Sequence, residues 1–418
     1  MKKLVLTMAS VLMLASMTFA QNETPQLPEH HGASDNQPAW GSSQSFTLAE
    51  GWNWWSTFIN GKNIEALESA LGENGLTIKT SGPFVSYING AWQGTLAGST
   101  IENSQMYAIE MNEPLEFSLM GSRAVVDNVA ISGITGWNWV GYPVNSEMTV
   151  AYALQNYNAL DGEVFKSSGP FVTFDGENNV WAGTLTQLQP GVGYKLYSNQ
   201  ESFTFYYPAM PQEGSKDYMP SQDVLATEWQ PQMASTPDNM NMIAVVSFDG
   251  EELRSDNVEI GVFNGEICRG AIRPIYVESR DRYVAFLTMY GENGEPFSFR
   301  LLDESGNIYE SSEAAVSYHA DAVVGSLRAP FELKFSTKNV ANNLKLFPNP
   351  VNRGEMVNMT LPGEGVKTVE VVNMLGSTMK SVRMTQGSEL SADMAPGIYT
   401  IKVTDAEGNV YVNKLVVK

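Results

Sequence analysis

Short segments of alternating apolar and polar residues recur along most of the chain, and they predict a multi-domain, β-rich protein. Between residues 228 and 336, segments such as "MNMIAVVSFDG" and "VEIGVFNGEICRGAI" alternate around Asp-Gly, Asn-Gly and Ser-Gly turns. Residues 344–418 hold about seven further short segments, broken by Pro-Gly and Leu-Gly. Such spacing is typical of antiparallel sandwiches, so we predict one β-sandwich in each of these two ranges.

The first half of the chain contains an internal repeat. "GWNWW" returns 85 residues later as "GWNWV", and "SGPFV" and "AWQGTL" return in the same order as "SGPFV" and "VWAGTL". Each copy also holds a helix-like stretch; in the first, Ile64, Leu67 and Leu71 recur at helical spacing. We therefore predict a duplicated small α+β module at residues 46–125 and 131–208.

Glycines predict where the elements of each module end. Gly75 and Gly162 follow the helix-like stretches and are placed to end them in the left-handed conformation. Asn89-Gly90 predicts a tight hairpin turn in the first copy, and Asp175-Gly176 predicts the corresponding turn in the second copy.

Three pairs of tryptophans occupy matching positions of the repeat. Alternate residues of a strand share a face, so the two tryptophans of GWNW point to one side, and the other side is also apolar. A strand that is apolar on both faces is typically buried on both, which favours core packing of one fold built twice. Tryptophan rings also stack on sugars, so glycan binding is the alternative for the six candidates Trp52, Trp54, Trp92, Trp137, Trp139 and Trp181.

The remaining segments predict export and connection. Residues 1–20 combine two lysines, an apolar run and a small residue before Gln21, which is typical of a cleaved signal peptide. Residues 21–45 are polar and without periodicity, which predicts a disordered leader. Residues 209–227 are polar and rich in proline, and we interpret them and residues 337–343 as linkers.

The charge of the chain limits its partners. There are 46 acidic residues against 25 basic ones, a formal net charge of −21, although residues 344–418 hold eight basic and seven acidic residues. A chain this acidic repels phosphate groups, so we predict no nucleic acid partner. The single cysteine, Cys268, excludes an intramolecular disulfide.

The Pro-Asn-Pro start of residues 344–418, the Gly-Ile-Tyr before a strand and the closing Lys-Leu-Val-Val-Lys resemble the type A C-terminal sorting domain of the type IX secretion system of Bacteroidetes. The resemblance implies an Ig-like β-sandwich and export across both membranes to the cell surface or extracellular space. It implies as partners the translocon and a sortase-like peptidase that cuts within 337–343, with surface lipopolysaccharide as a further candidate. The implied signal positions are Pro348, Asn349, Pro350, Gly397, Tyr399 and Lys418. Residues 228–335 more weakly resemble a β-rich module of secreted Bacteroidetes surface proteins, which implies no activity.

Few residues suggest catalysis or metal binding. We expect Cys268 to be a small buried apolar residue, since no histidine lies near it in sequence. His319 lies in a predicted folded domain, whereas His30 and His31 lie in the predicted leader. The turns "DGENN" and "DESGN", which begin at residues 175 and 303, offer oxygen ligands for Ca²⁺ but do not match the EF-hand loop, so solvated turns are the preferred interpretation. We predict no catalytic residue, no metal site and no cofactor, with Ca²⁺ as the alternative.

These observations predict an acidic, secreted or surface-displayed protein that is not an enzyme and acts in adhesion, binding or scaffolding. The ligand class would be a glycan, a host protein or a matrix protein. Glycan binding through the paired tryptophans is the first alternative, and exposure of Trp54 and Trp139 on one concave surface would favour it. A surface hydrolase is the second alternative, and it requires a cleft with two carboxylates about 5–9.5 Å apart.

Overall fold

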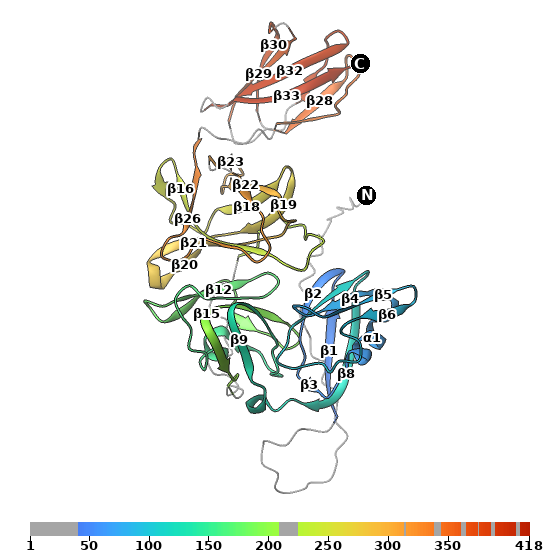
Figure 1. Cartoon of the computed structure of the whole chain (residues 1–418). Helices are drawn as coiled ribbons and strands as arrows, with labels where there is room; N and C mark the ends of the chain where they lie inside the picture. The colour runs from blue at the N-terminus through green and yellow to red at the C-terminus, as the bar shows by residue number, and fades with distance from the viewer. Residues whose placement is uncertain are drawn as a thin grey trace, which may run out of the picture. The chain divides into compact units, whose positions relative to one another are not determined.

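The computed structural model describes residues 41–208, 225–312, 315–337, 344–360, 365–374, 376–385, 389–406 and 410–418. The predicted signal peptide, almost all of the leader with His30 and His31, and most of both linkers lie outside the described residues. In the described part, strands predominate and no helix is long and apolar enough to cross a membrane. The prediction of a multi-domain, β-rich chain is confirmed (Figure 1).

The first repeat module, module 1, is a five-stranded antiparallel sheet in the order β2-β7-β4-β5-β6, with the smaller sheet β1-β8-β3 beside it. One helix packs its apolar side, Ile64, Leu67 and Leu71, into the core that the two sheets share. The elements are β1 (Ser42–Leu48), β2 (Gly51–Trp55), β3 (Ile59–Asn60), α1 (Ile64–Leu71), η1 (Gly72–Asn74), β4 (Gly75–Lys79), β5 (Phe84–Ile88), β6 (Ala91–Gly94), β7 (Tyr107–Met111) and β8 (Leu115–Arg123).

Two details of module 1 differ from the sequence prediction. Strand β1 begins at Ser42, so the module starts before residue 46. The sequence around Gln44 is polar and did not predict a strand, but the Gln44 side chain is buried. Helix α1 ends at Gly72, which takes the left-handed φ of 57°. Gly75 was the predicted cap, and that prediction is wrong because Gly75 has an extended φ of −77° and begins β4.

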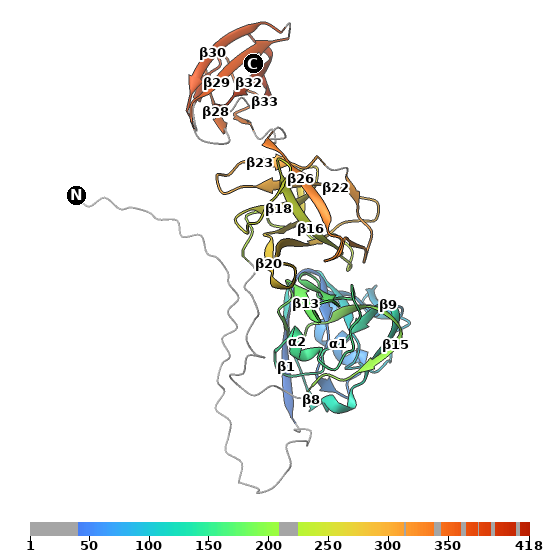
Figure 2. The same cartoon turned by 90° about the vertical axis from the view of Figure 1, so that its left-hand side faces the viewer.

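The second repeat module, module 2, has a sheet of the same order, β9-β15-β11-β12-β13. Its strand β9 spans the positions of β1 and β2, and β15 spans those of β7 and β8. The elements are η2 (Val126–Asn128), β9 (Ile131–Val140), β10 (Met148–Thr149), α2 (Val150–Ala153), β11 (Val164–Lys166), β12 (Phe171–Asp175), β13 (Val180–Gly183), β14 (Gln187–Leu188) and β15 (Tyr194–Phe205). Figure 2 shows both short helices, α1 and α2.

The turns of the two modules are similar but not identical. Asn89 and Gly90 both take positive φ values, 52° and 85°, and form the predicted tight turn between β5 and β6. In module 2 the connection is longer, and Asn179 rather than Asp175-Gly176 supplies the left-handed residue, with φ 54°. Helix α2 ends at Ala153, so Gly162 takes its φ of 79° in a later turn and does not cap the helix.

The sandwich domain follows and consists of two mainly antiparallel sheets around one apolar core. One sheet has the order β17-β16-β21-β20, and β25 and β26 add to β16 in parallel; the other has the order β19-β18-β22-β23, and β24 adds to β22. The elements are β16 (Met240–Phe248), β17 (Glu251–Glu252), β18 (Glu259–Asn264), β19 (Ile267–Ile272), β20 (Ile275–Val277), η4 (Glu278–Arg280), β21 (Arg282–Met289), β22 (Pro296–Leu302), β23 (Ile308–Glu310), β24 (Val316–Ser317), β25 (Val323–Val324) and β26 (Phe331–Phe335).

The last domain is a smaller sandwich, and the described residues form the seven strands that the sequence predicts. The sheets are β27-β28-β31 and β30-β29-β32-β33, and both views show the four-stranded sheet (Figures 1 and 2). The strands are β27 (Lys345–Phe347), β28 (Met356–Thr360), β29 (Lys367–Asn373), β30 (Thr378–Met384), β31 (Glu389–Ser391), β32 (Gly397–Thr404) and β33 (Val410–Val417). Its core includes Val369, Val371, Ile401, Val403 and Leu415.

Candidate functional site

In the GWNW motif the chain bends at the glycine, and the asparagine side chain holds the bend by hydrogen bonds to the backbone four residues earlier. Gly51 and Gly136 take φ values of 82° and 97°, which strongly favour glycine. The Asn53 side chain accepts a hydrogen bond from Ala49 N at 2.9 Å and donates to Ala49 O at 2.8 Å. Asn138 makes the same two bonds with Ile134, at 3.0 and 2.7 Å. Gly and Asn therefore form the bend, and the two tryptophans project from it.

The tryptophans of GWNW lie outside the apolar cores of their own modules. Trp52 Nε1 donates to Ser235 O at 2.8 Å, and Trp54 Nε1 donates to Pro237 O at 2.7 Å. Trp137 Nε1 donates to a third carbonyl of the sandwich domain, Asp321 O, at 2.8 Å. Trp52, Trp54 and Trp137 are therefore bound by the sandwich domain, whereas Trp139 contacts Lys79 and Lys195 of the two modules.

Two buried lysines of module 2 lie among these rings. The Lys166 Nζ is 4.3 Å from the centroid of the Trp137 ring and 6.0 Å from that of Trp54. The Lys195 Nζ is 5.0 Å from Trp54 and 5.1 Å from Trp139. Such cation–π contacts are strongest where water is excluded, and both lysine side chains are fully buried.

Two aspartates of the sandwich domain balance these cations. Asp321 accepts from Lys166 at 2.9 Å and from Lys195 at 2.7 Å, and Asp238 accepts from Lys195 at 2.6 Å. Lys166 also donates to Asn239 Oδ1 at 2.8 Å. We call this set the junction cluster; its members are Trp54, Trp137, Trp139, Lys166, Lys195, Asp238, Asn239 and Asp321.

The junction cluster is electrostatically balanced. Burial lowers the pKa of Lys166 to about 8, although the charge of Asp321 opposes that shift. Burial alone would raise the pKa of Asp321, but the positive charges of Lys166 and Lys195 hold it below its usual value. Two cations face two carboxylates, so breaking one pair leaves an uncompensated buried charge. These ion pairs join module 2 to the sandwich domain.

The two modules contact each other reciprocally, as in an isologous dimer. Ser56 N donates to Gly191 O at 3.2 Å, and the equivalent Gly141 N donates to Ser104 O at 2.8 Å. Lys79 of module 1 lies 5.8 Å from the Trp139 ring, as Lys166 of module 2 lies over Trp54. The repeat therefore forms an internal pair with approximate twofold symmetry.

A second contact between module 2 and the sandwich domain surrounds Phe171. This ring is fully buried and lies 5.6 Å from that of Phe286. Beside it, the buried Asp175 accepts from Arg280 at 2.5 Å. Burial opposes ionisation of Asp175, yet hydrogen bonds from Asn178, Ser279 and Arg280 lower its pKa. This acid, the first residue of "DGENN", thus forms an ion pair between domains.

An aromatic groove of about 490 Å³ lies between the edge strands β13 and β20. Trp181 and the exposed Tyr276 are among its lining residues, and Asn178, Glu278 and Ser279 add polar groups. The Trp181 ring packs against the core of module 2 and lies 5.2 Å from the Phe174 ring. The equivalent Trp92 of module 1 packs against Tyr87 at 5.6 Å and lines no such groove among the cavities described here. Of the six tryptophan candidates, Trp181 lines one of the three cavities described here, and the other five line none of these three.

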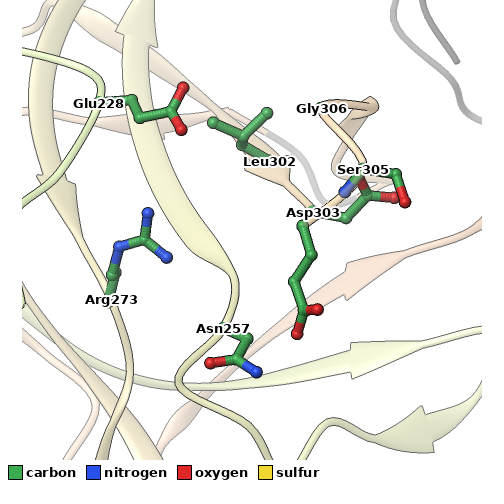
Figure 3. A pocket seen from close by; sticks show the side chains of 8 residues that line it. Glu228, Asn257, Arg273, Leu302, Asp303, Ser305 and Gly306 are labelled. Carbon is green, nitrogen blue, oxygen red and sulfur yellow. The ribbon is translucent and has the colours of Figure 1, made fainter.

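A polar pocket of about 580 Å³ lies within the sandwich domain (Figure 3). Glu228, Arg273 and Asn257 line it together with the turn that begins at Asp303. The Asp303 carboxylate accepts from Ser305 N at 2.9 Å and Asn307 N at 2.8 Å, so it closes its own "DESGN" turn. Within the described ranges, no three His, Cys, Asp or Glu side chains are grouped to hold a metal ion.

Two residues were considered for catalysis, His319 and Cys268. His319 is exposed, and its backbone N–H contacts Met240 Sδ at 3.4 Å. Cys268 is buried, and burial raises the pKa of its thiol. Sequence reasoning missed Lys166, Lys195 and Asp321; a lysine inside an otherwise apolar strand was the available signal for the first two.

The residues implied as sorting signals meet at one end of the last domain. Asn349 donates to Lys414 O at 2.7 Å and accepts from Val416 N at 2.9 Å, so its side chain continues the edge of β33. Lys418 N donates to Val351 O at 2.8 Å. The mostly buried Tyr399 donates to Ala395 O at 2.8 Å, just before Gly397. Pro348 and Pro350 flank Asn349, and both are preceded by cis peptide bonds.

Comparison with known proteins identifies this domain. Residues 345–418 match the family model of the secretion system C-terminal sorting domain. No curated protein matches the chain. The crystal structure of dimeric latent PorU from Porphyromonas gingivalis aligns with 90% of this chain at 10% identity and a TM-score of 0.17, and this chain spans 30% of the PorU chain. The crystal structure of DIP-gamma IG1+IG2 aligns with 44% of this chain and 97% of its own, at 9% identity and a TM-score of 0.12.

TM-scores this low carry no argument about fold or function, so the family model and the geometry of residues 345–418 carry the identification. The match spans all seven strands of the last domain. This chain is therefore a type IX secretion cargo whose C-terminal sorting domain directs it to the cell surface or the extracellular space.

Proposed function

We propose that residues 41–337 form a non-enzymatic binding body that the sorting domain carries out of the cell for adhesion, binding or scaffolding. The junction cluster is the observation that supports this function. Its polar and aromatic residues come from both repeat modules and bind them to the sandwich domain. The surfaces of these three parts are thereby held in one arrangement. A rigid body is suited to binding because less conformational freedom is lost when a ligand is held.

The test is to expose the purified chain to arrays of glycans and of host and matrix proteins, beside a panel of glycoside, peptide and ester substrates. Saturable binding without turnover supports the proposal. Turnover of a substrate at a rate that scales with enzyme concentration and survives repeated purification would overturn it in favour of the hydrolase alternative.

Glycan binding is the second candidate, and the groove between β13 and β20 favours it. Trp181 and Tyr276 are among its lining residues, and Asn178 and Glu278 offer polar atoms for hydroxyl groups. A volume of about 490 Å³ suits a small ligand. Of the six tryptophans that the sequence hypothesis named, this site includes Trp181 and none of the four GWNW tryptophans.

The repeat supplies a matched control for the glycan candidate. Trp181→Ala should weaken binding about tenfold or more, as expected for losing roughly 1.4 kcal/mol of ring contact. Trp92→Ala removes the equivalent ring of module 1 and should leave the affinity unchanged. Equal affinities of both variants and the parent would exclude this groove as the glycan site.

A further inference from the structure

Lys166 places a primary amine in the buried junction cluster. It is the last residue of β11, its side chain is fully buried, and its Nζ lies 4.3 Å from the centroid of the Trp137 ring. Burial lowers the pKa of Lys166 to about 8. A lysine that loses its water in this way reaches the neutral form near neutral pH, and the neutral amine is a nucleophile.

The side-chain amide of Asn239, in the sandwich domain just before β16, faces this amine. Lys166 Nζ donates to Asn239 Oδ1 at 2.8 Å. Because a C=O bond is about 1.2 Å long, the amide carbon Cγ lies at most about 4 Å from Nζ. Asn239 is buried, and its Nδ2 donates to Ser168 O at 2.9 Å and to Ser167 O at 3.3 Å, which holds the amide in this orientation. An amine and a carbonyl carbon held this close react as parts of one molecule.

Asp321 is placed to accept the proton that Lys166 must lose. Its Oδ1 lies 2.9 Å from Lys166 Nζ. Burial opposes its ionisation, but the charges of Lys166 and Lys195 hold its pKa below the usual value, so Asp321 is a carboxylate. An ionised carboxylate accepts a proton readily and is a poor acceptor for an amine, whereas the neutral amide of Asn239 is the better electrophile. The geometry therefore supplies a nucleophile, an electrophile and a base.

We propose that Lys166 and Asn239 form an isopeptide bond that joins module 2 covalently to the sandwich domain. Asp321 takes a proton from the Lys166 ammonium group, and the neutral Nζ attacks Asn239 Cγ. The Nζ–Cγ bond forms and the Cγ–Nδ2 bond breaks while a proton passes from Nζ to Nδ2, so that ammonia leaves. Asp321 then gives its proton to the ammonia. One ammonium group and one amide thus yield a substituted amide and an ammonium ion, and no other reactant is needed.

The inference goes beyond the proposed binding function and depends on no ligand. Two neighbours of the reacting pair provide internal comparisons. Asn241 Oδ1 also accepts from Lys166 Nζ, but at the longer distance of 3.2 Å. Lys195 is equally buried, but its ion pairs are with the carboxylates of Asp238 and Asp321. We therefore expect Asn241 to keep its amide and Lys195 to keep its amine.

Peptide mapping by mass spectrometry of the purified, folded chain tests the proposal. The chain is denatured fully and then digested with trypsin, which cuts after an unmodified lysine. The expected product is a branched peptide that contains residues 166 and 239 and is lighter than its two linear parts by one ammonia molecule. Cleavage should fail after Lys166 and proceed after Lys195 in the same digest. On a denaturing gel the branched form should separate from the linear form, because the bond closes a loop in the unfolded chain.

Variants assign the bond to its two residues. Lys166→Arg keeps the positive charge without a primary amine, and Asn239→Ala removes the electrophile, so each should abolish the branched peptide. Asn241→Ala is the matched control and should keep it. Chain that has not reacted retains the ion pairs of the junction cluster, so the two forms can be unfolded separately.

The parent chain decides the question even if a variant misfolds. Folded parent that trypsin cuts completely after Lys166 once denatured, with no branched peptide, overturns the proposal. A branched peptide that persists in Asn239→Ala, or that joins Lys166 to Asn241 or Asp321 instead, overturns it equally, because the acceptor is then another side chain.

Discussion

Replacing Asp321 by Asn removes one negative charge from the junction cluster and little else. Asp321 has a left-handed φ of 61°, a conformation that Asn tolerates, and the two side chains have nearly the same shape. Its carboxylate contacts the fully buried Lys166 at 2.9 Å and Lys195 at 2.7 Å. The substitution therefore tests charge balance without a cavity or a backbone change.

The expected loss follows from the contacts that remain. Removing one member of a buried ion pair costs roughly 3–5 kcal/mol, because the other charge stays buried and uncompensated. Lys195 keeps Asp238 at 2.6 Å, and Lys166 keeps Asn239 Oδ1 at 2.8 Å. We therefore expect the lower end, about 3 kcal/mol, which lowers the melting temperature by roughly 6–12 °C for a unit of this size.

Denaturant unfolding followed by tryptophan fluorescence measures this loss, since Trp54 and Trp137 lie over Lys166. Asp281→Asn is the matched control. Asp281 also has a left-handed φ, 46°, but its ion pair with Arg254 is exposed, so its loss should matter much less. Adding Lys166→Met to Asp321→Asn should restore part of the stability, because the unpaired cation is then gone. Equal unfolding curves for Asp321→Asn and Asp281→Asn would refute the reasoning.

Three further predictions follow from other contacts. The pKa of Lys166 in the folded chain is about 8, below its ordinary 10.5, so between pH 8 and 10.5 the unfolded state binds more protons than the folded state. The free energy of unfolding should therefore rise with pH across this window. Urea unfolding of Lys166→Met at the same pH values should lack this rise. Gly141→Ala would place a Cβ 2.3 Å from Asn103 O across the module contact and should cost about 1–3 kcal/mol in thermal unfolding, whereas Gly82→Ala meets nothing within 4 Å and should be nearly neutral. Asn349→Ala removes two hydrogen bonds to β33 and should destabilise the sorting domain by about 1 kcal/mol. It should also lower the total amount of chain on the cell surface and in the medium, so unchanged export would argue against a role for these two bonds.

Local patterns predicted the elements well where one residue type dictates one conformation. Asn89-Gly90 forms its turn because both residues tolerate positive φ. The helix end was misplaced because Gly72 and Gly75 were both able to end it, and the choice depends on tertiary packing of Leu71. Strand β1 was missed at its start because Gln44 is polar yet buried by hydrogen bonds to Thr57 and Phe58.

The junction cluster was beyond prediction from sequence. Lys195 and Asp321 are 126 residues apart and belong to different domains, so no local pattern connects them. The pairing of Trp137 with a carbonyl of Asp321 depends on how module 2 docks, and that docking depends on shape. The sorting domain was predictable because its motif and its family signal lie in one continuous segment.

The clamp between Asn349 and strand β33 has a consequence for synthesis. The first strand region of the sorting domain is held by contacts to residues 414–418, so the domain cannot close until these residues are available to pair. A chain cut short by a premature stop codon would lack β33 and would leave Asn349 without its partners. The domain that directs the protein to export therefore closes fully only on chains that include β33, and we expect shorter copies to be exported less.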